Sequence, residues 1–175
     1  MIAMYFYKED APTMIKKEIA DLLIKQINLE LHSGYLYLEF ANYYEEKNLP
    51  GFAHWYVKQA GEEYGHAMKI RGFLIDAGVK VTLSPLADTE KDFKDVKAPL
   101  LSGLKHEQFI TASINKIYEK ALDLKDHLTA NFLQWFIEEQ GEEETNAQNN
   151  IDKIELVGDK GASLYLLDKE IGRRE

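Results

Sequence analysis

The chain contains no cysteine. This absence excludes disulfide bonds, cysteine-ligated zinc sites, rubredoxin-type centres and iron–sulfur clusters. Long apolar runs are missing as well, since no stretch approaches the roughly 20 residues that a membrane-spanning helix needs. The N-terminal segment lacks the basic lead of a secretory signal and carries Lys8, Glu9 and Asp10. We therefore expect a cytoplasmic protein that does not act at a membrane.

Basic residues are fewer than acidic ones. The chain has 30 acidic residues against 21 basic ones, a formal net charge of -9. This balance argues against nucleic acid or an anionic membrane as the main partner, and it attracts cations. Hydrophobic residues make up 45% of the 175 residues and charged residues 29%, which predicts a single folded domain rather than a disordered chain.

Apolar residues recur at steps of three and four over most of the chain, which is the spacing of one helix face. We expect Thr13 to cap the first helix, and Pro50 suits the first turn of the second. No β-strand pattern extends beyond a few residues. The predicted helices span about 13–47, 50–78, 99–125, 128–157 and 162–171.

Residues 79–96 lack the helical pattern and contain Pro85. A segment of this length is too long for a tight turn, so we expect a crossover between the second and third helices. Two helices, a long crossover, two more helices and a short fifth helix at the C-terminus are the layout of an all-α four-helix bundle with one crossover connection.

Each of the four long helices carries an acidic residue that could face the bundle interior. Glu63 and His66 lie three residues apart and therefore share a helix face. Glu30 lies on a stripe otherwise filled by apolar residues, where an ionised carboxylate is costly unless a positive charge neutralises it. Glu107 and Glu143 supply one carboxylate from each of the last two long helices. Carboxylates and imidazole together suit iron or manganese.

Two divalent metal ions would balance these four carboxylates. We expect Glu30 and His66 to bind the first ion. We expect Glu107 and Glu143 to bind the second, with Glu63 bridging two ions that lie about 3.5–4 Å apart in such sites.

Two further side chains are candidates for a catalytic role. Gln140, one turn before Glu143, is expected to hydrogen-bond within the site or to hold a bound oxygen species. Tyr37 lies seven residues after Glu30 on the same helix face, where a phenol can supply an electron and limit the leakage of reactive oxygen. Plain core packing is the alternative for Tyr37, and for Trp135 we prefer packing to electron donation.

Five segments resemble the signature segments of bacterial non-haem ferritins, in the family's order and spacing. They are NLELHSGYLY, QAGEEYGHAM, KHEQFIT, FLQWFIEEQGEEE and SLYLLDKE. The resemblance covers about residues 14–171, so we expect a ferritin-like domain over 14–175 and an N-terminal extension over 1–13. It implies a ferritin-like four-helix bundle that stores iron, with ferroxidase activity that uses O2 or H2O2. It also implies a homo-oligomeric shell, normally of 24 subunits.

The resemblance further implies a third iron site beside the first two. The residues that match it are Glu62, Glu139 and Glu142, with Glu143 shared between sites. Bacterioferritin has a haem-binding methionine where this chain has Tyr64, so we expect iron as the only cofactor and no haem.

Two other functions remain open. A peroxide-consuming di-metal oxidase in a small oligomer, similar to rubrerythrin or manganese catalase, would use the same kind of centre. The lack of cysteine and of a second Glu-x-x-His pair argues against it. A passive or DNA-protecting cage is less compatible with a complete ligand set inside one subunit, and the acidic balance provides no footprint for DNA.

Overall fold

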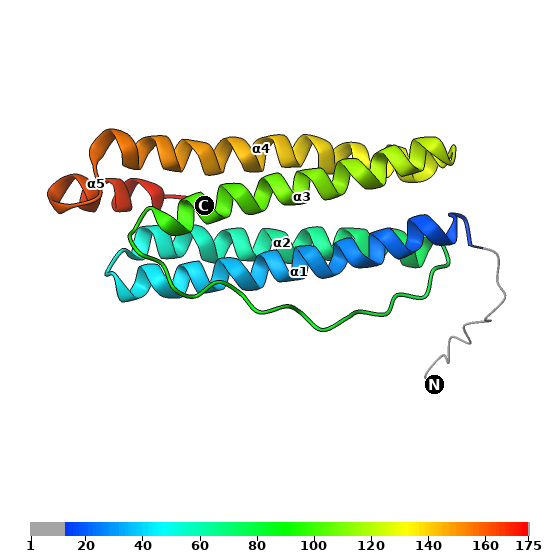
Figure 1. Cartoon of the computed structure of the whole chain (residues 1–175), viewed down its shortest axis with the longest axis horizontal. Coiled ribbons are helices and arrows are strands. Elements are labelled where there is room, and N and C mark those ends of the chain that lie inside the picture. Colours follow the sequence, from blue (N-terminus) through cyan, green and yellow to red (C-terminus); the bar gives the residue numbers. More distant parts are fainter. Residues whose placement is uncertain (1–12, 175) are drawn as a thin grey trace.

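The computed structural model describes residues 13–174 and shows an all-α bundle (Figure 1). Figure 1 shows α1 beside α2 and α3 beside α4, each pair forming a helical hairpin. No strand occurs among the described residues. The predicted four-helix bundle is confirmed, whereas the predicted extension over 1–13 lies almost wholly outside the described residues. The helices are α1 (Lys17–Glu46), α2 (Pro50–Asp76), α3 (Ala98–Asp123), α4 (His127–Val157) and α5 (Gly161–Ile171).

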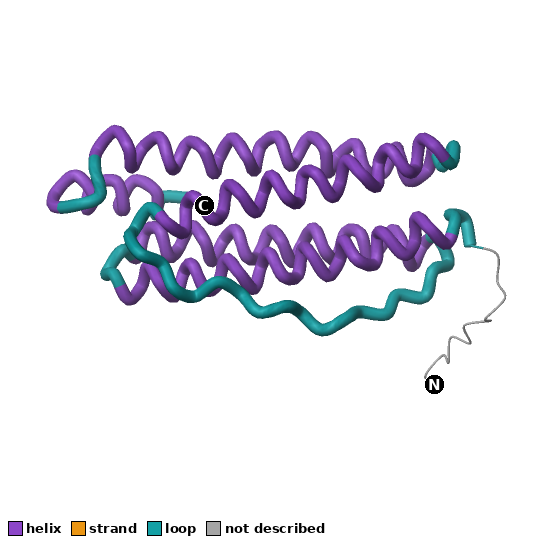
Figure 2. The backbone as a smooth tube through the Cα atoms, in the orientation of Figure 1, coloured by secondary structure: helices purple, strands orange, loops and turns teal. Residues whose placement is uncertain are grey.

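The crossover, residues 77–97, runs the length of the bundle beside α1 (Figure 2). Asn28 on α1 makes two hydrogen bonds with the backbone of Ser84, at 2.6 and 3.1 Å. Phe93 packs edge-on against Phe40, with ring centroids 5.2 Å apart. The crossover returns to the end of the bundle at which α2 starts, so α3 runs parallel to α2. The middle turns of the four long helices therefore lie at the same level of the bundle.

The start of α1 differs from the prediction. The helix begins at Lys17, and Thr13 does not cap it, since the Thr13 hydroxyl donates to the carbonyl of Ile15 at 2.8 Å. The Met14 amide donates to the Ala77 carbonyl at 3.0 Å. This bond ties the segment ahead of α1 to the end of α2. The N-cap position of α1 is Lys16, so Thr13 lies three residues too early in the chain to cap the first free helical amides.

The start of α4 is one residue earlier than predicted. Asp126 ends the preceding turn by capping α4, because its carboxylate accepts from the Thr129 amide at 3.0 Å and from the Thr129 hydroxyl at 2.9 Å. His127, expected to interrupt the helices, is instead the first residue of α4.

Two apolar clusters fill the bundle, one toward each end, and a polar band separates them. In α1, for example, Ile27 belongs to one cluster and Phe40 to the other, with buried Glu30 between them. In α2, Tyr56 and Ile70 flank the polar positions in the same way. The rigid packing on both sides fixes the side chains of the polar band. No helix in the described part of the chain is long and apolar enough to cross a membrane.

Helix α5 docks on the start of α2. Asp168 is 2% exposed, and its Oδ1 accepts from the amides of Gly51 at 2.8 Å and Phe52 at 3.0 Å. The carboxylate therefore caps the N-terminus of α2 from a distant part of the chain. A Cβ on Gly51 would lie 1.8 Å from the Asp168 carbonyl oxygen, so only glycine permits this approach. The docking brings the end of the chain alongside α2.

Candidate metal centre

The polar band between the apolar clusters contains the five residues that the sequence predicts to bind two metal ions, together with Gln140. All of them are at most 5% exposed, although carboxylates are rarely buried without a compensating charge. In the described part of the chain, no lysine or arginine is buried to supply that charge. The residues are Glu30 on α1, Glu63 and His66 on α2, Glu107 on α3, and Gln140 and Glu143 on α4.

Glu30, Glu63 and His66 form the first group of ligand atoms. One atom from each side chain lies within 4.8 Å of the others. His66 Nδ1 lies 3.3 Å from Glu63 Oε2. Glu30 Oε2 is buried and has no hydrogen-bond partner among the described residues. A buried carboxylate oxygen without a donor is costly, so the arrangement fits a cation that this oxygen would bind.

A second group consists of His66, Glu139 and Glu143, again with ligand atoms within 4.8 Å of one another. His66 Nε2 lies 3.7 Å from Glu139 Oε1. The imidazole thus lies at the junction of the two groups, whereas the sequence assigned it only to the first ion. Glu139, assigned to a third site, lies next to the buried ligands.

Glu107 belongs to neither group in the described residues. Its carboxylate accepts a hydrogen bond from the Tyr37 hydroxyl and another, at 3.2 Å, from Gln140 Nε2. Tyr37 is 1% exposed and packs between Phe40 and Tyr56. Both predicted catalytic side chains, Tyr37 and Gln140, therefore donate hydrogen bonds to the same predicted ligand, Glu107.

Two glutamines that sequence reasoning did not assign to the site orient its carboxylates. Gln26 Nε2 donates to Glu30 Oε1 at 2.8 Å. Gln59 Nε2 donates to Glu63 Oε1 at 3.3 Å and to Glu143 Oε2 at 2.6 Å. In both helices the glutamine precedes a ligand by four residues, so the repeated Gln-x-x-x-Glu spacing was the available signal.

The buried carboxyl groups hold protons more tightly than exposed ones. Burial and repulsion from Glu63 keep the pKa of Glu30 well above its ordinary value. Burial, with repulsion from Glu107 and Glu143, also raises the pKa of Glu63. For Glu143, burial and repulsion from Glu107 raise the pKa to about 8. Burial raises the pKa of Glu107 too, against the opposing effect of the hydrogen bonds from Tyr37 and Gln140. A divalent cation would replace these protons.

The other residues matched to a third iron site lie at the periphery. Glu142 is exposed, and the side chain of Glu62 is 45% exposed and forms an ion pair with Arg174. Apart from the shared Glu143, which is itself buried, Glu139 is the one predicted third-site residue that the structure brings to the buried group.

Trp135, for which we prefer packing to electron donation, lies edge-on to the His66 ring, with ring centroids 5.4 Å apart.

Comparison with known proteins places this arrangement in a family. A family model described as "Ferritin-like domain" matches residues 20–157. A bacterial non-haem ferritin from Campylobacter jejuni is 39% identical over 158 residues, which cover 90% of this chain and 95% of the relative. One from Staphylococcus aureus is 32% identical, covering 92% and 97%. The open pore ferritin from Archaeoglobus fulgidus superposes with a TM-score of 0.90 at 36% identity, over 93% of this chain and 99% of that one. The chain therefore belongs to the ferritin family.

Proposed function

We propose that this protein, an iron-storage ferritin, oxidises Fe(II) to Fe(III) at the buried carboxylate centre, with O2 or H2O2 as the oxidant. One observation carries the proposal: Glu30, Glu63 and His66 present ligand atoms within 4.8 Å of one another, and Glu30 Oε2 has no other partner among the described residues. Carboxylates with one imidazole are a ligand set that suits iron.

The first step is the exchange of protons for Fe(II). Because burial raises the pKa of Glu143 to about 8, this carboxyl group is largely protonated at neutral pH before metal binds. Binding of two ferrous ions releases such protons and makes the carboxylates ligands. We propose that Glu63 bridges the ions, with Glu30 and His66 on one side and Glu107 and Glu143 on the other.

The second step is electron transfer to the oxidant. Two ferrous ions lose one electron each, and O2 takes up both electrons with two protons to give H2O2. When H2O2 is the oxidant, two electrons and two protons convert it to two water molecules. Gln26 and Gln59 hold the carboxylates in place with their amide donors throughout.

We assign a supporting redox role to Tyr37 and a positioning role to Gln140. The Tyr37 hydroxyl already donates to Glu107, which can accept the phenolic proton when the ring gives up an electron. Gln140 Nε2 donates to Glu107 Oε2 at 3.2 Å and to Thr111 Oγ1 at 3.3 Å, so its amide is held toward the same ligand. Both residues would act on the iron through Glu107.

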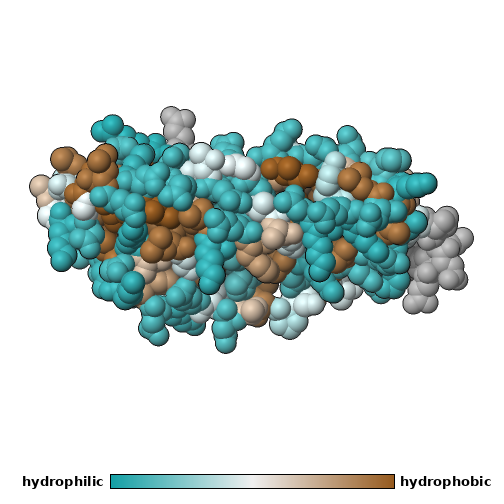
Figure 3. Space-filling view, turned by 45° about the horizontal axis from the view of Figure 1, so that its top comes forward, coloured by the Kyte–Doolittle hydropathy of each residue, from teal (hydrophilic) through white to brown (hydrophobic). Residues whose placement is uncertain are grey.

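Storage requires an assembly, and the surface supports one. Figure 3 shows apolar side chains gathered in patches among polar ones on one face of the molecule. Tyr35 is 46% exposed, Leu38 44% and Tyr64 59%, and all three line a shallow apolar groove between α1 and α2. Exposed apolar surface of this kind is typical of subunit contacts. We propose a homo-oligomeric shell of 24 subunits in the cytoplasm, with a third iron position at Glu62, Glu139 and Glu142.

The experiment is rapid-mixing absorbance of the Fe(III) product after Fe(II) and air are added to the metal-free protein. We expect oxidation much faster than in buffer, and a loss of at least about tenfold in the Glu63→Ala variant. Glu45→Ala, which removes an exposed carboxylate from α1, is the matched control and should retain the wild-type rate. Equal rates for wild type and Glu63→Ala would show that the buried centre does not perform the oxidation.

A further inference from the structure

The end of the chain contributes a charged side chain to the edge of the metal centre. The guanidinium of Arg174 donates to Glu62 Oε2 and, at 2.7 Å, to Gln59 Oε1. Its Cζ lies 4.6 Å from the centroid of the Trp55 ring. Trp55, Gln59 and Glu62 follow one another at steps of four and three, so they form one face of α2 that receives the arginine. The Arg174 side chain is 20% exposed.

This contact depends on the docking of α5 rather than on a loose tail. Asp168 anchors α5 to the N-terminus of α2 through two hydrogen bonds. His54 Nε2 lies 3.1 Å from the Arg174 carbonyl oxygen. These contacts on either side hold the guanidinium over α2.

The arginine reaches the buried carboxylates through Gln59. Because Gln59 Oε1 accepts from Arg174, its Nε2 faces inward and donates to Glu143 Oε2 at 2.6 Å. The same amide donates to Glu63 Oε1 at 3.3 Å. Arg174 therefore fixes the orientation of the Gln59 amide while it also occupies the Glu62 carboxylate.

We propose that Arg174 is a positioning residue that neutralises Glu62 in the metal-free protein, and that a cation entering the third site must displace its guanidinium. The inference rests on the proposed function, since it takes Glu62 as a ligand of the third iron. A guanidinium and a divalent ion repel each other at close range, so they compete for Glu62. The competition weakens the third site relative to the buried pair and makes it fill last.

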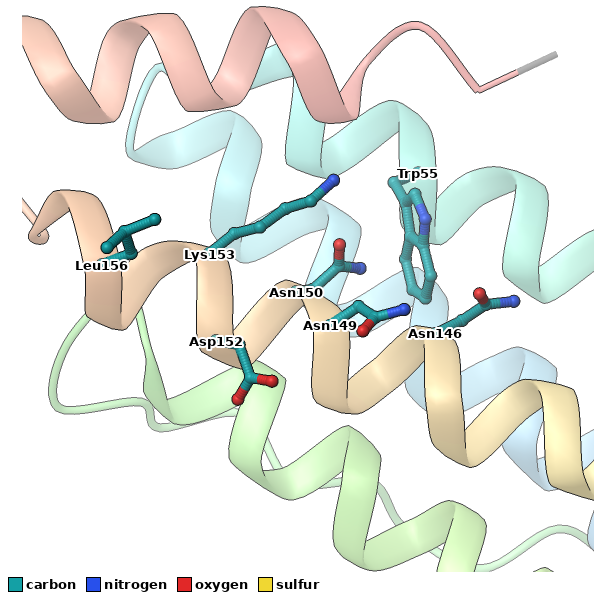
Figure 4. A pocket seen from close by; sticks show the side chains of 7 residues that line it. All are labelled: Trp55, Asn146, Asn149, Asn150, Asp152, Lys153 and Leu156. Atoms are coloured by element: carbon teal, nitrogen blue, oxygen red, sulfur yellow. The ribbon is translucent and has the colours of Figure 1, made fainter.

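The structure offers the displaced side chain a polar destination. A cavity of about 380 Å³ lies beside Trp55, the residue whose ring also supports the guanidinium. Figure 4 shows the asparagines of α4 together with Trp55 around this space. The amide oxygens of these asparagines can accept from arginine. The polar lining residues on α4 are Asn146, Asn149, Asn150, Asp152 and Lys153, and the Lys153 ammonium pairs with Glu170 of α5 at 2.8 Å.

The test is calorimetric titration of the assembled, metal-free protein with Zn(II), which binds carboxylate and imidazole ligands without redox chemistry. We expect a tight phase from the buried sites and a weaker phase that the Glu62→Gln variant lacks. In Arg174→Gln, the weaker phase should tighten by up to about fivefold, the range expected for removing one partly exposed competing charge. Arg173→Gln removes the same charge one residue away, from an exposed side chain, and should leave both phases unchanged.

A spectroscopic readout follows the arginine itself. In a Trp135→Phe background, Trp55 is the remaining tryptophan. Zn(II) binding in the weaker phase should change its emission, because the guanidinium leaves the ring. The change should be absent when Arg174→Gln is added to this background.

The outcomes separate the two claims. A tight phase with a weaker phase that is the same in wild type and Arg174→Gln, or weaker in the variant, overturns the competition while the proposed function stands. The same holds if the weaker phase is absent from wild type and variant alike. Loss of the tight phase itself would overturn the proposed function and, with it, the role of Arg174.

Discussion

The amide nitrogen of Gln59 on α2 lies 2.6 Å from Oε2 of Glu143 on α4, inside the polar band of the bundle. This hydrogen bond favours the ionised form of Glu143, although burial and neighbouring charge raise the pKa of the carboxyl group overall. A neutral donor thus favours the ionised form of a buried carboxylate that we propose to bind a metal ion. The same relationship recurs between Gln26 and Glu30 at 2.8 Å.

Replacing Gln59 by leucine removes this donor and should weaken metal binding at the buried centre. We expect the affinity of the tight phase to fall by roughly 10–100-fold, the range for lost partners of metal ligands. Titration of metal-free protein with Zn(II) measures it. Gln108→Leu, on the exposed face of α3, is the control. An unchanged tight phase in Gln59→Leu would mean that the amide does not support the ligands.

The raised pKa of Glu143 predicts how the metal-free protein responds to pH. Burial raises it from 4.5 to about 8 in the folded state, so the folded protein holds a proton that the unfolded chain has lost. The contribution of Glu143 to the free energy of unfolding is fully present below about pH 4.5 and is lost as the pH rises through about 8. The Tm of the metal-free protein should therefore be lower at pH 8.5 than at pH 6.

A matched variant isolates the contribution of that carboxyl group. Glu143→Gln keeps the shape of the side chain but cannot ionise, so its Tm should fall less between pH 6 and pH 8.5. Glu138→Gln changes an exposed carboxylate on the same helix and should behave as wild type. A wild-type Tm that rises over this range would contradict the assignment.

Tyr37 is predicted to affect the redox step more than the fold. Tyr37→Phe removes the hydroxyl that donates to Glu107 and should cost about 1 kcal/mol of stability. We expect Zn(II) to bind nearly as before, while a transient tyrosyl radical seen by electron paramagnetic resonance in wild type disappears. If wild type shows no such radical during Fe(II) oxidation, or Tyr37→Phe leaves it intact, Tyr37 is a packing residue only.

The capping of α2 by Asp168 predicts a local loss of stability. Asp168→Ala should destabilise the protein by about 1–2 kcal/mol, because two amides at the start of α2 lose their acceptor. Thermal unfolding measures this, and Asp159→Ala, an exposed change before α5, is the control. Gly51→Ala should be at least as damaging, since its Cβ would collide with the Asp168 backbone. Equal Tm values for Asp168→Ala and wild type would show that the cap contributes nothing.

The burial of the candidate ligand residues on one helix face each could be predicted because the relevant information is local. The i, i+3 spacing of Glu63 and His66 and the position of Glu30 on an apolar stripe are visible in the sequence. The helix bounds followed from the same periodicity, to within a few residues. Thr13 failed as a cap because the contact between Met14 and Ala77 joins distant parts of the chain.

The missed features depend on such distant contacts. The spacing of Gln59 to Glu63 could have indicated a place in the site. Its hydrogen bond to Glu143, however, joins two helices and two residues that are 84 positions apart in the chain. Arg174 and Glu62 are separated by 112 positions, and only the docking of α5 brings them together. No periodic pattern encodes where a short terminal helix folds back.

Iron storage through the buried centre is tested most directly by anaerobic titration with Fe(II), followed by admission of air, on protein whose size is measured by light scattering. We expect saturation at about two or three ferrous ions per subunit, fast oxidation, and continued uptake of iron into a large shell. Binding in a small oligomer without further uptake would contradict storage. The absence of any stoichiometric binding would contradict the metal centre itself.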